Sequence, residues 1–122
     1  MKLRIKGDSL RLRVSPSEVQ RLMDFGRVEE TIHFSPGAHL TYGLEHSETA
    51  ACVTVSHTPD GFTVLVPSGI AQGWGSGDEI GIYGAVANGS ASLEVAIEKD
   101  FACLDRSHGG NQDTYPNPKA AC

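Results

Sequence analysis

The chain has 122 residues, of which 39% are hydrophobic and 20% charged, as expected for one ordinary globular domain with a hydrophobic core. Its net charge is −5, which disfavours general binding of duplex nucleic acid, because such binding usually needs a basic domain. No apolar run approaches the length of about 18 residues that a transmembrane helix needs, so no membrane association is expected.

The first residues of the chain alternate between charged and apolar side chains. Leu3 and Ile5 fall on one face of an expected strand over 2–6, and Leu10 and Leu12 fall on one face of a second strand over 10–14. The turn residues between these strands predict a hairpin with one apolar and one strongly basic face. The segment lacks the continuous apolar stretch of a secretory signal, and we therefore expect a cytoplasmic protein.

A well-capped helix is predicted over residues 16–25. Ser15 provides the N-cap, Pro16 the first helical residue and Glu18 the capping-box partner. Gly26 suits the left-handed conformation that ends many helices.

The remaining elements follow from alternation and turn residues. Strands are expected over residues 27–34, 39–46, 50–57, 62–66, 79–86 and 91–98. A short helix is expected over 68–74, with Trp74 in the core, although its two glycines weaken it. Few apolar residues follow position 104, so we expect a domain over 1–104 and an extended or disordered tail over 105–122, onto which Tyr115 could still dock.

This order of elements predicts an α+β fold. We expect a single antiparallel sheet of seven or eight strands, curved or closed into a barrel, with the two helices at its openings. The order strand–helix–strand occurs twice, about fifty residues apart. A tandem duplication and a chance match of element order are both open interpretations.

Charge is distributed unevenly along the chain. Residues 1–27 contain seven Lys and Arg against three acids, whereas residues 28–122 contain three against twelve. Two interpretations stay open: the basic part binds an anionic partner, or the two parts neutralise one another across a sheet. Under the first, the guanidinium and ammonium groups of the hairpin hold phosphate or carboxylate oxygens. The candidate anion-binding residues are Arg4, Lys6, Arg11 and Arg13.

Acidic residues on the last strand are the candidate metal ligands. Glu94 and Glu98 lie four residues apart and therefore on one face of a strand, where they could hold Mg²⁺ or pair with basic side chains. A closed sheet lined with both charges resembles the triphosphate tunnel metalloenzymes. That family carries a Glu-x-Glu-x-Lys motif on its first strand, where this chain has Lys2-Leu3-Arg4-Ile5-Lys6, so the resemblance is confined to architecture.

The cysteines do not suggest a disulfide framework, because their number is odd and no two lie at short spacing. Cys52 lies in the apolar run AACVTV and is expected to be buried. The redox roles of Cys103 and Cys122 stay open.

Both ends of the chain carry recognisable motifs. The opening LRIKGDSLRLRVSPSEV and the closing VAIEKDFACLDR and DTYPNP resemble a family of small uncharacterised bacterial proteins. The resemblance implies a stand-alone cytosolic domain and brings no activity or catalytic residues with it.

Three functions are compatible with these observations. The first is a non-enzymatic binding or accessory module that uses the basic hairpin face for an anionic small molecule or an acidic protein partner. The second is a Mg²⁺-dependent triphosphate or polyphosphate hydrolase of tunnel type. The third is a structural or homo-oligomeric protein. We favour the first, because no catalytic motif is present.

Overall fold

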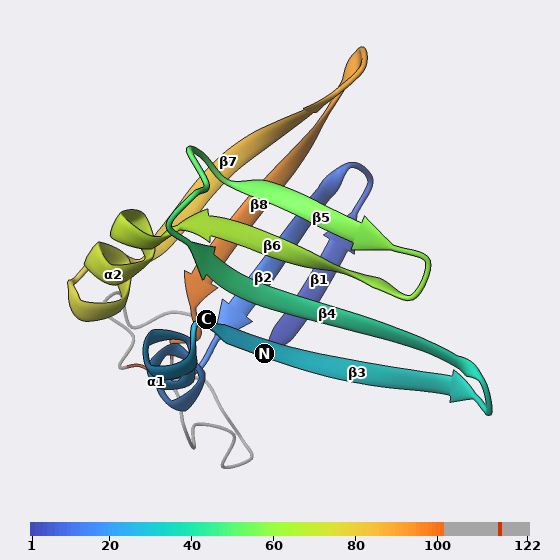
Figure 1. Ribbon diagram of the computed structural model, residues 1–122, viewed down its shortest axis with the longest axis horizontal. Helices are drawn as coiled ribbons and strands as arrows, with labels where there is room; N and C mark the ends of the chain where they lie inside the picture. Colours follow the sequence, from blue (N-terminus) through green and yellow to red (C-terminus); the bar gives the residue numbers. More distant parts are fainter. Residues whose placement is uncertain (102–114, 116–122) are drawn as a thin grey trace.

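The structure is a computed structural model that describes residues 1–101 and Tyr115. It has an α+β fold with eight strands and two helices (Figure 1). The first half of the chain forms β1 (Lys2–Lys6), β2 (Ser9–Val14), α1 (Pro16–Phe25), β3 (Arg27–Ser35) and β4 (Ala38–Ser47). The second half forms β5 (Thr54–Thr58), β6 (Gly61–Pro67), α2 (Ser68–Ser76), β7 (Gly81–Asn88) and β8 (Ala91–Lys99).

The strands form two sheets of four rather than the single antiparallel or barrel-like sheet that the sequence predicted. Sheet A has the order β1-β2-β8-β7, and sheet B has the order β3-β4-β6-β5. Both sheets are mixed, because β2 runs parallel to β8 and β4 runs parallel to β6, while the outer pairs are antiparallel hairpins. The predicted closed sheet was therefore wrong, although the predicted class and number of strands were right.

The two halves of the chain exchange hairpins to build these sheets. Each half contributes one hairpin to sheet A and one to sheet B, so that element order and strand pairing are both repeated. The turns match in detail: the Asp8 carbonyl accepts from Glu94 N at 2.9 Å, and the Asp60 carbonyl accepts from Thr41 N at 2.8 Å. Positions 52 residues apart in the two leading hairpins are therefore structurally equivalent.

The first helix begins and ends as the sequence predicted. Glu18 N donates to Ser15 Oγ at 3.4 Å, and Ser15 N donates to Glu18 Oε1 at 2.9 Å, which completes the capping box. Gly26 ends the helix with φ +81°. The second helix lies where it was predicted but extends to Ser76, and no side chain caps its start.

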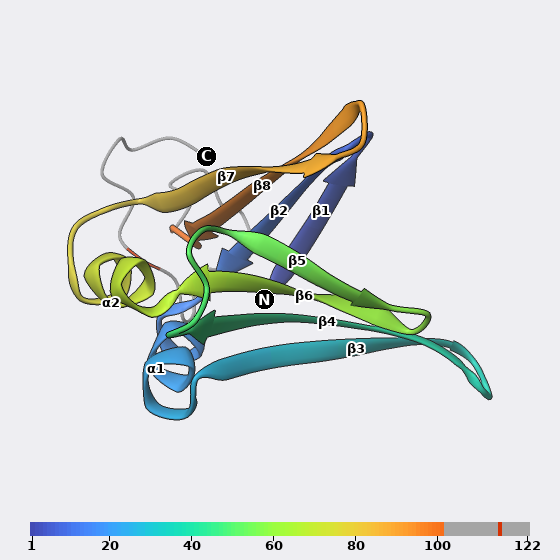
Figure 2. The ribbon, with the colours of Figure 1, turned by 45° about the horizontal axis from the view of Figure 1, so that its top comes forward.

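The core lies between the two sheets and beneath the helices, which occupy the same end of the molecule (Figure 2). Trp74 of α2 is fully buried, as predicted, and its indole N–H donates to the Ile80 carbonyl at 3.2 Å. The other large side chains that are almost completely buried are Leu12, Val14, Leu22, Leu44, Val64, Val66 and Ile97. Neither helix in the described part of the chain combines the length and the apolar character that crossing a membrane requires.

Two further expectations can be compared with the structure. Cys52 is exposed rather than buried, because β5 begins only at Thr54 and Val53 is the side chain that enters the core. Tyr115 docks on the body, where its N–H donates to the Asp100 carbonyl at 2.7 Å and its ring lies 5.6 Å from that of Phe101. The rest of the predicted tail lies outside the described residues.

Candidate functional site

The outer face of sheet A carries the polar side chains that the sequence singled out. Because strand residues alternate between faces, the register aligns these side chains in rows across the four strands. The central row runs Arg4, Arg11, Ala96 and Tyr83 from β1 to β7. The row next to it runs Lys6, Ser9, Glu94 and Ala85.

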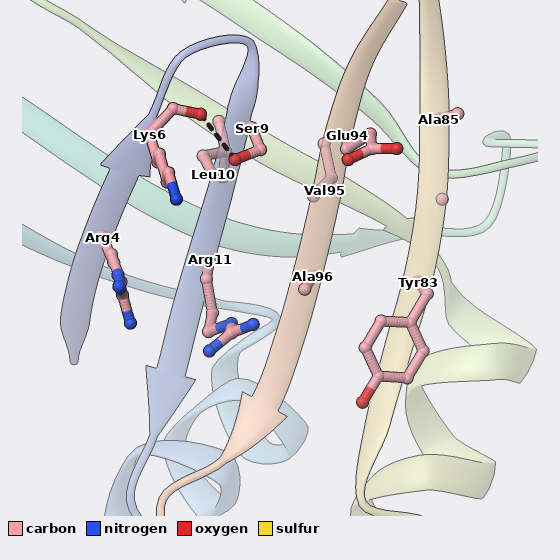
Figure 3. A pocket seen from close by; sticks show the side chains of 11 residues that line it. Arg4, Lys6, Ser9, Leu10, Arg11, Tyr83, Ala85, Glu94, Val95 and Ala96 are labelled. Carbon is pink, nitrogen blue, oxygen red and sulfur yellow. Dashed lines mark hydrogen bonds between the residues drawn. The ribbon is translucent and has the colours of Figure 1, made fainter.

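These two rows line a cleft of about 670 Å³, which we call the basic cleft (Figure 3). Long cationic side chains form its wall on β1 and β2, and Tyr83 and Glu94 stand on β7 and β8. The floor between them is low, because Ala85 and Ala96 carry only methyl side chains. The volume is within the usual range for small-molecule sites.

Two of the cations in the basic cleft are uncommitted. Arg4 and Lys6 are exposed, and within the described residues neither forms an ion pair or a side-chain hydrogen bond. The adjoining turn is fixed independently of the charges, because Ser9 Oγ donates to the Lys6 carbonyl at 2.7 Å. The two charges are therefore available to a ligand.

Arg11 belongs to a fixed group on the same face. Its Nε lies 3.2 Å from Glu98 Oε1, and the Tyr83 hydroxyl donates to Glu98 Oε2 at 2.8 Å. This hydrogen bond to a carboxylate, together with burial, raises the pKa of Tyr83 above its ordinary value. The carboxylate of Glu98 thus joins a cation from the first half of the chain to an aromatic ring from the second.

Arg13 points out of the same face but lines a neighbouring depression. That depression, of about 410 Å³, lies near the start of α1 and is shared with Lys2, Arg21 and Glu18. Lys2 pairs with Asp100 at 2.9 Å. Of the four predicted anion-binding residues, the structure therefore brings Arg4, Lys6 and Arg11 together and leaves Arg13 beside them.

The predicted metal ligands share a face and a strand but not a site. Four residues of strand separate Glu94 from Glu98 by about 13 Å along the backbone, and Glu98 is occupied by Arg11 and Tyr83. Among the described residues, no group of three or more His, Cys, Asp or Glu side chains is arranged to hold a metal ion. The assignment of Mg²⁺ to Glu94 and Glu98 gains no support from this geometry.

Tyr83 is the site residue that the sequence did not identify as functional. A signal was nevertheless present, because Ile82 and Val86 alternate with Tyr83 and Ala85, which puts Tyr83 on the polar face of a strand opposite Ala96. The side chain is 61% exposed.

The outer face of sheet B differs from that of sheet A. The positions equivalent to Arg4, Lys6 and Arg11 are Ser56, Thr58 and Thr63, which line a smaller depression of about 150 Å³. The cation beside it is neutralised, because Arg27 donates to Glu29 at 2.7 Å and to Glu45 at 2.9 Å. These contacts raise the pKa of the Arg27 guanidinium, the bond to Glu29 most strongly and against the opposing effect of burial.

Comparison with known proteins gives one relationship. No curated protein and no solved structure matches the chain. The sequence model of a family described as a family of unknown function, DUF7009, matches residues 1–119, which is almost the whole chain. The expected membership of an uncharacterised family is thus confirmed, and the chain belongs to the DUF7009 family.

Proposed function

We propose that this domain is a non-enzymatic binding module for a small anion with several negative charges, such as a polyphosphate or a polycarboxylate, held in the basic cleft. The observation that carries the proposal is the pair of exposed, uncommitted cations, Arg4 and Lys6, on one wall of a cleft of about 670 Å³. Arg11 adds a third charge at the floor, partly balanced by Glu98. A guanidinium offers two parallel donors to one phosphate or carboxylate group, and an ammonium adds a point charge.

The internal repeat argues that this hairpin can be built without these cations. Sheet B uses the same hairpin with Ser56, Thr58 and Thr63 at the equivalent positions. Like charges that stand next to one another on a sheet repel, so a basic row costs stability unless something offsets it. A ligand would account for charges that repel one another at positions where the equivalent hairpin has Ser and Thr.

The size of the patch favours a small ligand over an extended one. Residues 28–122 contain three Lys and Arg against twelve acids, so the surface beyond the hairpin repels a long polyanion. Glu94 and Glu98 also limit the positive region on the side of β8. We therefore favour a small anion over an acidic protein partner or duplex nucleic acid.

The tunnel-hydrolase alternative loses its structural basis. That alternative needs a closed sheet, and the two four-stranded sheets here are not closed into a barrel. No specific observation favours it over simple binding.

The test is calorimetric titration with inorganic tripolyphosphate, pyrophosphate and citrate. We expect saturable binding of at least one of them, and an increase of about 10 °C in the thermal midpoint at one hundred times the dissociation constant. The variant Arg4→Ser/Lys6→Thr carries the residues of sheet B, so it should fold normally and bind roughly 10- to 100-fold more weakly.

The control is Arg21→Ser, which removes one positive charge, against two in the double variant, from α1 and outside the basic cleft. It should leave the affinity nearly unchanged. If none of the three anions binds, or if Arg21→Ser weakens binding as much as the double variant, the proposal is wrong. A large loss of stability in the double variant would instead favour the structural interpretation of the two cations.

A further inference from the structure

Tyr83 forms a flat aromatic surface on the wall of the basic cleft opposite the cations. Its ring lies over the backbone of Gly81, where an added Cβ atom would come within 2.6 Å of the phenol oxygen and 2.8 Å of Cζ. Glycine at this position therefore lets the ring lie against the strand. Viewed onto the sheet, the ring is seen broadside, and the side chain remains 61% exposed (Figure 3).

The orientation of the ring is fixed in advance. Its hydroxyl donates to Glu98 at 2.8 Å, and Arg11 holds the same carboxylate at 3.2 Å. A ring tied at its hydroxyl cannot rotate freely, so a ligand that stacks on it loses little additional conformational entropy. Exposed tyrosines are common, but one that is held flat over a floor of Gly and Ala has the form of a stacking platform.

The platform and the uncommitted cations are separated by the width of the sheet. Three strand spacings of about 4.8 Å lie between β7 and β1, which puts the backbones of Tyr83 and Arg4 about 14 Å apart, and both side chains project over the floor between them. An inorganic phosphate chain can occupy the cationic wall and leave the ring uncovered. A ligand that contacts both walls needs a planar ring at one end and phosphates at the other.

We propose that the ligand of the basic cleft is a nucleotide that carries two or three phosphates; this inference rests on the proposed function. Its base stacks on Tyr83, and its phosphates lie against Arg4 and Lys6. Every nucleobase presents a face that can stack on an aromatic side chain, and such stacking tolerates different bases.

Glu94 sets the direction in which the ligand lies. It stands on β8 between Ser9 and Ala85, and the view in Figure 3 shows its carboxylate on the side of β7. A carboxylate repels phosphate but accepts hydrogen bonds from sugar hydroxyls or from the amino group of a base. This arrangement keeps the phosphates on the β1 and β2 side and the nucleoside on the β7 and β8 side.

A single nucleotide fits better than a strand of nucleic acid. Proteins that bind single strands stack successive bases on several aromatic side chains along a basic groove. Of the residues that the structure describes on the outer face of sheet A, Tyr83 alone is aromatic. The acidic remainder of the chain would also repel the phosphates of further nucleotides.

The test compares ATP, GTP, CTP and UTP with inorganic tripolyphosphate by calorimetric titration, with EDTA and again with Mg²⁺. At least one nucleotide should bind the wild-type protein more tightly than tripolyphosphate does, by between about 5- and 150-fold. In Tyr83→Leu, the nucleotide should bind no more tightly than tripolyphosphate, and the affinity for tripolyphosphate should stay nearly unchanged. Tyr83→Phe keeps the ring and should keep most of the ratio. ATP and tripolyphosphate differ in charge, but this difference affects the wild type and the variants alike. A change in the ratio of the two affinities between variants therefore reports the stacking on Tyr83.

The outcomes separate this inference from the proposed function. If tripolyphosphate binds as tightly as every nucleotide and Tyr83→Leu changes nothing, the nucleotide inference is wrong and the anion-binding proposal stands. If neither nucleotides nor inorganic anions bind, both are wrong. If oligouridylate of ten residues binds far more tightly than any single nucleotide, a single strand is the ligand, and the inference is overturned.

Discussion

The parallel junction between the two halves of the chain makes a sharp prediction about Gly61. This residue begins β6 with φ +158°, directly opposite Thr41 of β4. A Cβ atom at position 61 would overlap the carbonyl oxygen of Thr41, and the neighbouring bond from Thr41 N to the Asp60 carbonyl is only 2.8 Å long. Gly61→Ala therefore cannot be accommodated without moving one strand of the junction.

The expected cost has three parts. An alanine at positive φ costs about 1 kcal/mol. Loss of the Thr41–Asp60 hydrogen bond costs about 1 kcal/mol more, and displacement of the strand adds at least as much again. We therefore expect Gly61→Ala to lower the free energy of unfolding by about 3 kcal/mol or more, a large part of the 5–15 kcal/mol typical of a domain.

Gly7→Ala is the matched control. Gly7 lies in the turn of the equivalent hairpin with φ +56°, and nothing lies within 4 Å of the position that a Cβ atom would occupy. This variant should therefore lose only the cost of the conformation, about 1 kcal/mol.

The assay is urea unfolding monitored by the fluorescence of Trp74, the single tryptophan of the chain, which is fully buried in the native state. Neither Gly7 nor Gly61 lies next to Trp74 in the sequence, so a single cooperative change in Trp74 fluorescence reports unfolding of the whole domain in both variants. Equal losses of stability in the two variants would refute the parallel pairing of β4 with β6 at this register.

Three further predictions follow from the charged and aromatic contacts. Burial opposes the charge on both the Met1 amine and Glu18, yet their polar contacts outweigh it. The amine contacts Glu18 and Glu30, which raise its pKa above 8.0, and Glu18 contacts the amine and Ser15, which lower its pKa below 4.5. The stability lost in Glu18→Gln should therefore be greatest between about pH 5 and 8 and shrink outside that window; a loss independent of pH in unfolding curves would contradict this. The absorbance titration of Tyr83 at 295 nm is obtained as the difference from the same protein carrying Tyr83→Phe, because the chain has three tyrosines. It should give a pKa above 10.0 in the wild type and one nearer 10.0 in Glu98→Gln, whereas an unchanged pKa would mean that the hydrogen bond is not made. Trp74→Phe should lower the free energy of unfolding by about 2 kcal/mol, because the bond to the Ile80 carbonyl and part of the buried area are lost; calorimetry showing no change would contradict its place in the core.

The sequence predicted correctly those helices and turns that are determined by residues close together in the chain. The capping box and the final glycine of α1 lie within twelve residues and were read correctly. The hairpin of β7 and β8 turns at Asn88-Gly89, a pair that favours tight turns whatever surrounds it. Such signals need no knowledge of the rest of the chain.

The pairing of hairpins was not predictable in this way. Alternation shows which face of a strand is apolar, but not which strand lies beside it. Leu12 pairs with Ile97, which is distant in sequence, and no turn connects them. The same limit explains why Tyr83 was missed, because its proximity to Arg11 exists only once β2 and β8 are neighbours.

Hairpin exchange also gives the uneven charge a structural role. The cations of the basic cleft come from β1 and β2, whereas the carboxylates and the aromatic ring come from β7 and β8, so each half of the chain carries only one wall. The pairs Arg11–Glu98 and Lys2–Asp100 each join the two halves, as expected if the halves neutralise one another. Arg4 and Lys6, which lie on the same edge strand as Lys2, form no ion pair within the described residues and remain outside that neutralisation. The neutralisation and the anion-binding interpretations are therefore compatible: Arg11 and Lys2 join the two hairpins through ion pairs, and the charges of Arg4 and Lys6 are left over for a ligand.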